Sequence, residues 1–363
     1  MTQQHPEPLA DPVSPSDDSA SNIWPEVPPT AQVQLDLMVR HQLTGPNEPE
    51  HALGRLETLA MQLARIQQHS GSRVDGLRFE SPQLVVFAAD HGLADEGVSK
   101  ASQDLTVKRA LQMLAGKSPA NTLASLHGFD VTLVDAGIAT HLPAPADSAA
   151  AVPLLLRKIG YGTRNATLAP AMSAAQAQSA IQAGMDVVRH LPGNVLALGS
   201  LGVAGNASAA LLLSRLCGVP LADACGKDQE PDEVFGQARL ERLFVAASRH
   251  RRATSALDAL AAMGGFEIAM LCGAMLQAAS ERRVVLLDGF VAGAAALVAR
   301  SLVPAVTDYL VCTHRSAHPG HRLLLIHLQS APLLDLELRT AQGVGALLAW
   351  PLLQAAGSLL GRR

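Results

Sequence analysis

The sequence predicts an α/β protein built on a Rossmann-like parallel sheet flanked by helices. Two features of the 363-residue chain lead to this prediction. Short, continuously apolar runs alternate with longer Ala-rich stretches, which is typical of parallel sheets whose strands are buried on both faces. Several of these runs also end in a polar residue beside glycine, as turns from a strand into a helix often do.

The first elements in chain order are a polar tail and two helices. Residues 1–30 contain PEP, DP, SPSDDS and VPP and no apolar core, so we expect a disordered tail. From about residue 31 to 68, apolar residues recur at helical spacing, and the GPNEPE segment divides this region into two helices. Further helices are expected at LTVKRALQMLA and ASAALLLSRLC.

Five apolar runs are predicted to be the strands. They read LVVFAADHG, DVTLVDAGIA, NVLALGSLGVAGNAS, RRVVLLDGF and YLVCTHRSAHPGH, the last of which is expected to end at His321. Parallel strands joined by right-handed crossovers all point one way, so their carboxyl ends should meet at one ligand-binding cleft. Asp90, Asp135 and Asp288 each close a run beside a glycine turn and are expected to hold the cleft loops.

Composition and charge exclude several classes of function. Aromatic residues make up only 3% of the chain and the formal net charge is −4, so neither base-stacking platforms nor a basic field for nucleic acid is expected. The uncharged stretches 193–214 and 343–361 are interrupted by Gly, Asn, Gln or Pro, and we expect no membrane segment. Four scattered cysteines and a tail without a secretory signal indicate a cytoplasmic protein.

Metal and dinucleotide sites are not predicted. His314, His318 and His321 have suggestive spacing, but no Cys or carboxylate stands among them and no H-E-x-x-H or C-x-x-C pattern occurs. The GSLGVAG stretch matches neither the P-loop nor the dinucleotide-binding fingerprint. Glu267 lies in an expected helix and is assigned a capping or packing role. We therefore expect no metal and no cofactor.

Nine segments occur in the order typical of one enzyme family. They read FAADHGLADEGVS, AGKSPANTLA, DAGIA, GTRNATLAPAMS, ALGSLGVAGNAS, GGFEIAMLCGAML, VVLLDGF, HRSAHPGH and LRTAQGVGALLAWPLLQAA. From about Gln32 to its C-terminus the chain thus resembles the nicotinate-nucleotide–dimethylbenzimidazole phosphoribosyltransferase family. Members of that family make α-ribazole phosphate for the lower ligand of cobalamin.

The resemblance implies a Rossmann-like core and a small helical subdomain built from both ends of the chain. It places the N-terminal helices of the subdomain in residues 31–75, the α/β core in 76–335 and a C-terminal helical segment in 336–363. It also implies a homodimer that transfers phosphoribose from nicotinate mononucleotide to a benzimidazole nitrogen. The incoming base must lose a proton, so a proton acceptor is needed, and the phosphate needs backbone N–H groups and a cation.

The chain departs from the family pattern at three acidic positions. His318 stands in SAHPGH where the resemblance places a catalytic Glu, and Ser200 replaces a second Glu in the GSLG loop. Gln342 replaces a third acid in RTAQGVGA. Imidazole titrates near neutrality and often transfers protons, so His318 is a candidate replacement base.

The phosphate loop also departs from the pattern. Asp228 and Glu230 follow Gly226 where small residues are expected, and they would repel a phosphate, whereas Arg239 keeps a cation. The resemblance therefore assigns His318 and Ser200 as the catalytic positions. It assigns as substrate contacts Asp90, His91, Ser99, Ala101, Gln103, Arg109, Gly202, Gly226, Arg239, Gly264, Gly265 and Ser316.

Two functions of different classes stay open at this point. The first is the family reaction on nicotinate mononucleotide and a benzimidazole-type base, carried out by a homodimer. The second is a catalytically silent or substrate-shifted paralogue that acts as a binding or partner subunit, in a heteromer with an intact paralogue. The replaced glutamates at His318 and Ser200 are the reason for the second.

Overall fold

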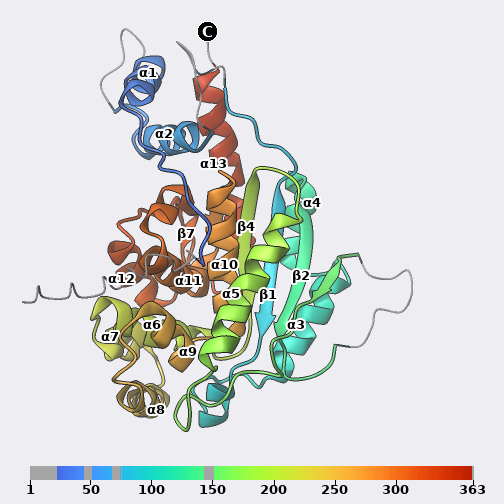
Figure 1. The fold of residues 1–363 in the computed structure, drawn as a ribbon, viewed down its shortest axis with the longest axis vertical. Helices are drawn as coiled ribbons and strands as arrows, with labels where there is room; N and C mark the ends of the chain where they lie inside the picture. The colour runs from blue at the N-terminus through green and yellow to red at the C-terminus, as the bar shows by residue number, and fades with distance from the viewer. Residues whose placement is uncertain (1–22, 45–50, 68–73, 75, 143–150, 362–363) are drawn as a thin grey trace, which may run out of the picture.

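A parallel sheet of six strands forms the centre of the molecule (Figure 1). The computed structural model describes residues 23–44, 51–67, 74, 76–142 and 151–361. The strands of the sheet are β1 (Gln83–Ala89), β2 (Asp130–Gly137), β3 (Leu154–Leu156), β4 (Val195–Leu201), β5 (Val284–Leu287) and β6 (Leu310–Cys312). They run in the order β3-β2-β1-β4-β5-β6, and every neighbouring pair is parallel. The predicted fold class is confirmed.

Helices lie on both sides of this sheet (Figure 1). The α-helices are α1 (Val33–Leu43), α2 (Arg55–Gln67), α3 (Asp104–Leu114), α4 (Pro119–His127), α5 (Ala174–Arg189), α6 (Gly205–Cys217), α7 (Leu221–Cys225), α8 (Glu233–Arg249), α9 (Ala256–Met263), α10 (Phe266–Ser280), α11 (Gly289–Leu302), α12 (Pro319–His327) and α13 (Val344–Leu360). Three short 3-10 helices are η1 (Gly92–Glu96), η2 (Lys227–Gln229) and η3 (Pro304–Tyr309). Helix α10 packs against four strands, and the two stretches expected to be helical form α3 and α6.

The five predicted strands are all present as β1, β2, β4, β5 and β6. The sequence does not predict the edge strand β3 or the small sheet of β7 (His314–Arg315) and β8 (Leu334–Asp335). Two or three residues are too few to show the alternation of apolar and polar residues by which a strand is recognised.

The end of the last predicted strand differs from the expectation. Strand β6 stops at Cys312 rather than running on to His321. His318 is the N-cap residue of α12 and Pro319 its first residue, a position that proline favours because its fixed φ suits a helix and its missing N–H is not needed there. His321 therefore lies in the first turn of a helix.

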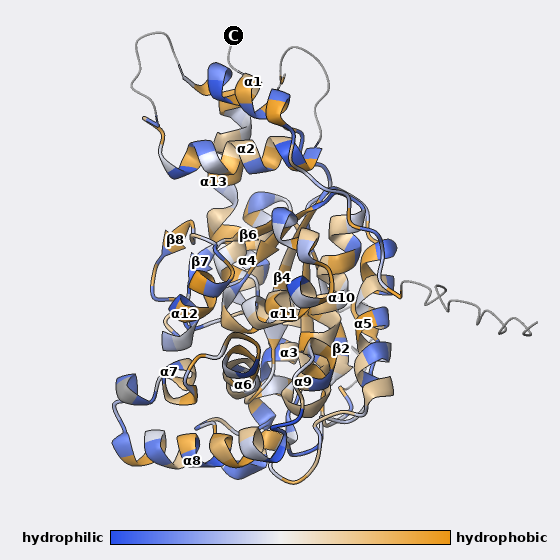
Figure 2. Ribbon diagram, turned by 60° about the vertical axis from the view of Figure 1, so that its left-hand side comes forward, coloured by the Kyte–Doolittle hydropathy of each residue, from blue (hydrophilic) through white to orange (hydrophobic). Residues whose placement is uncertain are grey.

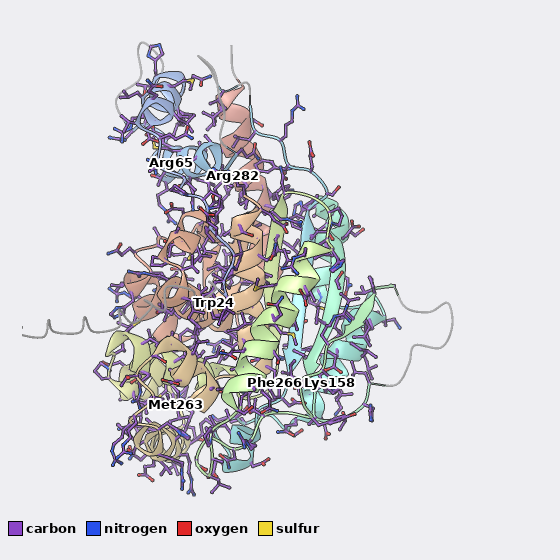
Figure 3. The ribbon with its side chains drawn as sticks, viewed as in Figure 1. Trp24, Arg65, Lys158, Met263, Phe266 and Arg282 are labelled. Carbon is purple, nitrogen blue, oxygen red and sulfur yellow. The ribbon has the colours of Figure 1, made fainter. Side chains whose placement is uncertain are left out.

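Helices α1 and α2 lie at one end of the molecule beside α13 (Figure 1). Asp36 of α1 accepts two hydrogen bonds from the guanidinium of Arg65 in α2, each at 2.6 Å. Arg282, labelled with Arg65 in Figure 3, donates to the main-chain oxygens of Arg65 and Ile66 and so ties this group to the core. The grouping agrees with a subdomain built from both ends of the chain, whose independence stays a prediction.

Residues 27–30 contact the rest of the molecule, although the composition of the N-terminal stretch suggests a disordered tail. Thr30 is buried and donates its hydroxyl to a carboxylate of η3 at 2.9 Å. The hydroxyl of Tyr309 donates to the main-chain oxygen of Pro28 at 2.7 Å. Prolines restrict this stretch in the unfolded chain, so two such contacts cost little entropy to form. Positions 1–22 lie outside the described residues.

The core is centred on α10 and α11, which are coloured largely hydrophobic in Figure 2. Helix α10 is buried along almost its whole length and packs closely on α5. A Cβ atom at Gly273 would lie 1.9 Å from the main-chain oxygen of Ile181, and one at Gly184 would lie 2.0 Å from that of Met270. These two glycines therefore set the spacing between α5 and α10.

Gly273→Ala is expected to lower the free energy of unfolding by about 3 kcal/mol, at the upper end of the cost of overpacking, because the added methyl group meets rigid helix backbone. Chemical denaturation measures this loss. Gly236→Ala on α8 is the matched control, since the nearest atoms there are Cβ and Cγ of Glu230 at 3.3 Å and the main-chain oxygen of Lys227 at 3.4 Å, so a shift of a few tenths of an ångström makes room. Equal stability of wild type and Gly273→Ala would contradict the close approach of the two helices.

No helix in the described part of the chain is both long and apolar enough to cross a membrane.

The four cysteines are free thiols, of which Cys217 is half-buried and the other three are buried. Burial raises the pKa of Cys312 to about 11, which keeps that thiol protonated and unreactive.

Candidate active site

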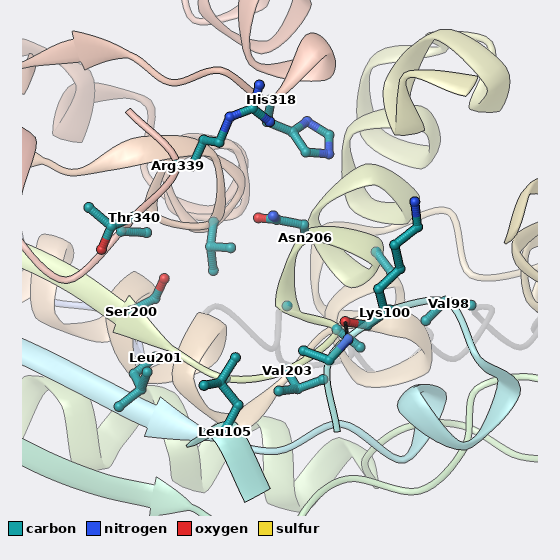
Figure 4. A pocket seen from close by; sticks show the side chains of 18 of the residues that line it. Val98, Lys100, Leu105, Ser200, Leu201, Val203, Asn206, His318, Arg339 and Thr340 are labelled. Carbon is teal, nitrogen blue, oxygen red and sulfur yellow. Dashed lines mark hydrogen bonds between the residues drawn. The ribbon is translucent and has the colours of Figure 1, made fainter. Parts of the chain in front are cut away.

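A cleft lies at the carboxyl edge of the sheet, where β4 ends (Figure 4). It consists of two adjoining cavities of about 380 and 400 Å³. The chain runs outward from β1 to β2 and β3 and then returns to place β4 on the other side of β1. The strand order reverses at this point, and open parallel sheets bind their ligands there. The predicted cleft is present at the predicted edge.

The lining of the cleft is cationic. Lys100, Arg109, Arg239 and Arg339 border it, and Glu230 is the only carboxylate among the described lining residues. Charges of one sign in a concave site with low-dielectric walls concentrate ligands of the opposite sign. The cleft is therefore suited to an anionic ligand.

All three positions where the chain departs from the family's acidic pattern face this cleft. Ser200 belongs to the end of β4, His318 to the start of α12 and Gln342 to the loop before α13, and all three line the same cavity. The main-chain N–H of Ser200 donates to the oxygen of Ala341 at 2.6 Å, which fixes the loop against the strand. The substitutions thus act together on one site.

His318 lies over the ring of Phe290, with ring centroids 4.1 Å apart and an angle of 12° between the planes. Burial, with a smaller contribution from Arg239, lowers the pKa of His318 to about 4. This is well below the near-neutral value expected from the sequence, because the apolar surroundings penalise the charged imidazolium. Its Nδ1 is buried and has no hydrogen-bond partner among the described residues, so His318 is a neutral imidazole with an unused polar atom at neutral pH.

Asp288 holds the loop that brings Gln342 to the cleft. Its carboxylate accepts hydrogen bonds from the N–H groups of Gly343 at 2.6 Å and Gly345 at 2.9 Å. A Cβ atom at Gly345 would lie 2.0 Å from Nδ1 of His314, so only glycine fits. Burial raises the pKa of Asp288 to about 7 despite these hydrogen bonds.

The other two strand-end carboxylates also bind backbone. Asp135 accepts from the N–H of Ile138 at 2.9 Å and pairs with Lys158, also at 2.9 Å. Asp90 accepts from the N–H of Ala139 at 2.9 Å. The prediction that Asp90, Asp135 and Asp288 hold the loops at this edge is confirmed.

A buried hydrogen-bonded chain involves His91 at the end of β1. Its Nε2 lies 2.6 Å from a carboxylate oxygen of Glu267, and its Nδ1 lies 2.9 Å from the hydroxyl of Ser208. Burial favours the neutral imidazole, but the Glu267 carboxylate outweighs it and raises the pKa of His91. Gly265 passes so close that a Cβ atom there would lie 2.3 Å from Cε1 of His91. Glu267 therefore forms a buried ion pair with His91, and the capping or packing role expected for it stays a prediction.

The residues that the resemblance assigns to the site fall into two groups. Those that line the cleft are Ser99, Ala101, Arg109, Ser200, Gly202, Gly226, Arg239, Ser316 and His318. Those that lie outside its lining are Asp90, His91, Gln103, Gly264 and Gly265. Gln103 donates to the main-chain oxygen of His91 at 3.1 Å, so it acts on the site only through the loop it holds.

Several lining residues were missed by sequence reasoning. Lys100, Asn206, Arg339 and Thr340 border the cleft and are labelled in Figure 4. Arg339 belongs to the glycine-containing RTAQGVGA segment and Lys100 follows Ser99 directly, so a search for cations beside the quoted motifs would have found both. In the described part of the chain, no group of three His, Cys, Asp or Glu side chains is arranged to hold a metal ion.

The stability of the protein is expected to fall between pH 6.5 and pH 4, because of three histidines at this edge. Burial lowers the pKa values of His314, His318 and His321, to about 4, 4 and 3. The unfolded chain, with histidine pKa values of about 6.5, binds protons there that the folded chain excludes. Their contribution is complete above pH 6.5 and is lost on acidification. Asp288 and Asp90 oppose this trend, since burial raises the pKa of each carboxyl and so favours the folded state at lower pH.

His321→Asn tests this prediction, since an Asn oxygen can still accept the Ser316 N–H that His321 accepts at 2.9 Å. The slope of unfolding free energy against pH should fall by about 1.4 kcal/mol per pH unit between pH 4.5 and 6. His190→Asn, at the exposed end of α5, is the control and should keep the wild-type slope. Parallel curves for His321→Asn and wild type would show that His321 does not exclude a proton.

The parallel sheet and the cationic cleft at its strand-order reversal define a class of α/β protein that binds an anionic small molecule. A family model described as phosphoribosyltransferase matches residues 29–362. The chain is 44% identical over 326 residues to the nicotinate-nucleotide–dimethylbenzimidazole phosphoribosyltransferase of Variovorax paradoxus, covering 90% of each chain. It is 43% identical over 340 residues to the enzyme of that name from Cupriavidus taiwanensis, covering 93% of this chain and 95% of that one.

Solved structures agree with these matches. The crystal structure of CobT from Thermus thermophilus superposes with a TM-score of 0.81 at 32% identity, covering 90% of this chain and 96% of the other. The protein is a phosphoribosyltransferase by fold and sequence. It belongs to the nicotinate-nucleotide–dimethylbenzimidazole phosphoribosyltransferase family.

Proposed function

We propose that this protein transfers the phosphoribosyl group of nicotinate mononucleotide to dimethylbenzimidazole or a closely related base. The product is an α-riboside phosphate for the lower ligand of cobalamin. The observation that carries the proposal is the cationic cleft at the strand-order reversal, in a chain more than 40% identical to enzymes of that name. Among the described lining residues, four cations stand against one carboxylate, which suits a substrate with a phosphate and a carboxylate.

The chemistry makes modest demands on the protein. The bond between ribose C1′ and the pyridinium nitrogen breaks, and its electron pair returns to the ring, so nicotinate leaves without needing a proton. A ring nitrogen of the incoming base forms the new bond to C1′. The base becomes cationic as this bond forms, and its other N–H therefore becomes acidic. A weak acceptor close to that N–H is sufficient to take the proton.

The residues divide these tasks in the following way. His318, neutral at the working pH, accepts the proton or a hydrogen bond from the base. Ser200 offers a hydroxyl to the same cavity in place of the family's second carboxylate. Arg239 holds the phosphate, with Lys100 beside it. Ser99, Ala101 and Arg109 border the part of the cleft that receives the base.

A second candidate function rests on the same substitutions. Ser200, His318 and Gln342 all face the cleft where the family pattern has acids, so a silent or substrate-shifted paralogue that serves as a binding or partner subunit is the alternative. We also propose a cytoplasmic homodimer for the active form, while the alternative calls for a heteromer with an intact paralogue. Light scattering of the purified chain distinguishes a dimer from a monomer that awaits a partner.

An assay of the purified full-length protein tests the proposed activity. Nicotinate mononucleotide is supplied with dimethylbenzimidazole, and free nicotinate and the phosphoribosylated base are separated by chromatography. The two products should form in equal amounts and only when the base is present. Purines and phenols in place of the benzimidazole define the range of acceptors. Absence of both products with every acceptor would favour the silent paralogue.

A further inference from the structure

Glu230 is the one acidic side chain of the described cleft lining, and its carboxylate lies between two of the cations. Its Oε1 lies 2.9 Å from Nζ of Lys100, and its Oε2 lies 3.5 Å from an Nη atom of Arg239. The side chain of Glu230 is only 15% exposed. The hydrogen bond from Lys100 lowers the pKa of Glu230, which keeps the carboxylate charged at neutral pH. The cleft thus contains an anion of its own.

The two cations are held in place by contacts other than Glu230. Arg239 donates to the main-chain oxygen of Cys225 at 3.0 Å, and its guanidinium lies 5.4 Å from the ring centre of Phe235. Nζ of Lys100 lies 4.7 Å from the same ring. These contacts would keep both charges beside the cleft if the Glu230 carboxylate moved away.

One donor at this place is unused. Nε of Arg239 is buried and has no hydrogen-bond partner among the described residues. A buried guanidinium donor without a partner costs free energy, and an oxyanion with several acceptor oxygens would satisfy it. A carboxylate has two oxygens and a phosphate three, so the phosphate can serve Lys100 and both sides of the guanidinium together.

We infer that Glu230 is an internal competitor for the anion site of the cleft, and that the phosphate of the substrate binds Arg239 and Lys100 by displacing the Glu230 carboxylate. The inference rests on the proposed function in so far as that function supplies a phosphorylated substrate. It assigns to Glu230 a role in specificity.

The exchange selects ligands by charge. A ligand with a single carboxylate gains little, because it must displace Glu230, a monoanion that the chain already holds at high effective concentration. A phosphate dianion brings a second charge and more acceptor oxygens, so it competes where a monoanion does not. Glu230 therefore repels the phosphate, as expected from the sequence, until its side chain moves toward solvent and makes room for the phosphate beside the two cations.

Glu230→Gln tests the inference with inorganic phosphate as the probe, by isothermal titration calorimetry on the full-length protein. Removal of the competing charge should lower the dissociation constant for phosphate by about tenfold or more, since charge-assisted hydrogen bonds to the two cations become available. Glu230→Ala is the second variant and should show the same gain. The selectivity for phosphate over acetate should fall in both, because monoanions then meet no competitor.

Asp232→Asn is the matched control. The Asp232 carboxylate lies 3.8 Å from Nζ of Lys100 but is 52% exposed, and Asn can replace it as the N-cap of α8. Equal gains for Asp232→Asn and Glu230→Gln would mean a general charge effect and would overturn the inference. Unchanged or absent phosphate binding in both Glu230 variants would overturn it as well.

A third comparison separates this inference from the proposed function. Arg239→Ala in the Glu230→Gln background should remove the gain in phosphate affinity, which locates the anion at the guanidinium. These titrations need no turnover. A protein that gains phosphate affinity on Glu230→Gln but never releases nicotinate would keep the inference and lose the proposed activity. Release of nicotinate by a protein that shows no gain in phosphate affinity on Glu230→Gln would keep the proposed activity and overturn the inference.

Discussion

His318→Ala is expected to lower turnover by about a hundredfold, the usual scale for loss of a proton acceptor. His318 borders the cleft, is neutral at working pH and carries a buried Nδ1 without a partner among the described residues. The loss should appear in kcat more than in KM, because the acceptor acts when the base becomes cationic and not when it binds. Steady-state assays of nicotinate release measure both constants.

His318→Phe is the control for shape. It keeps a ring that can stack on Phe290 but has no nitrogen, so it should be as impaired as His318→Ala. Wild-type turnover in either variant would mean that the proton leaves to solvent or to another group.

The pH profile gives a second test of the same residue. Because burial lowers the pKa of His318 to about 4, the imidazole stays neutral from about pH 5 upward. At saturating nucleotide, where binding of the phosphate is complete, the wild-type kcat should therefore be flat between pH 6 and 8 and should fall only on acidification toward pH 4. The KM for the nucleotide also follows the phosphate itself, whose second pKa is about 6. A kcat that rises through about pH 6.5 would indicate a solvated histidine and contradict the buried position.

Arg239→Ala is expected to abolish the stabilisation of the protein by nicotinate mononucleotide. A ligand that binds only the folded state stabilises it by about 2.7 kcal/mol at one hundred times its dissociation constant, and the melting temperature rises accordingly. The Arg239 side chain is only 17% exposed, and its buried Nε, which has no partner among the described residues, is available to an oxyanion. Thermal melts with millimolar nucleotide measure the shift.

Arg242→Ala provides the control on the same helix. Arg242 is 58% exposed, lies 3.9 Å from Glu96 and does not line the cleft, so its loss should leave the ligand-induced shift intact. A full shift in Arg239→Ala would place the phosphate elsewhere, with Arg339 as the next cation to test.

Much of the fold could be predicted because buried parallel strands have a recognisable pattern in the sequence. Two such runs are LVVFAADHG and VVLLDGF, which are apolar on both faces and end where the chain must turn. The presence of each strand, its direction and the edge of the sheet where it ends can therefore be inferred. Strand β3 has three residues and β7 two, and their pairing depends on neighbours rather than on their own pattern.

The site was predictable in its position and less so in its electrostatics. Motif comparison leads to His318, Ser200 and Arg239, which the structure places on one cleft. It could not reveal that Lys100 reaches Glu230 from a segment 130 residues away, because such a contact depends on how two loops fold beside each other. Nor could it show the low pKa of His318, which results from burial against Phe290.

The assay that tests the central claim most directly compares wild type with the double variant His318→Glu, Ser200→Glu, which restores both carboxylates of the family pattern. Both proteins receive nicotinate mononucleotide and dimethylbenzimidazole, and the phosphoribosylated base is quantified. We predict that the wild type forms this product with base-dependent release of nicotinate, and that the double variant also turns over. An inert wild type beside an active double variant would contradict the proposed function and identify a silent protein on a competent scaffold.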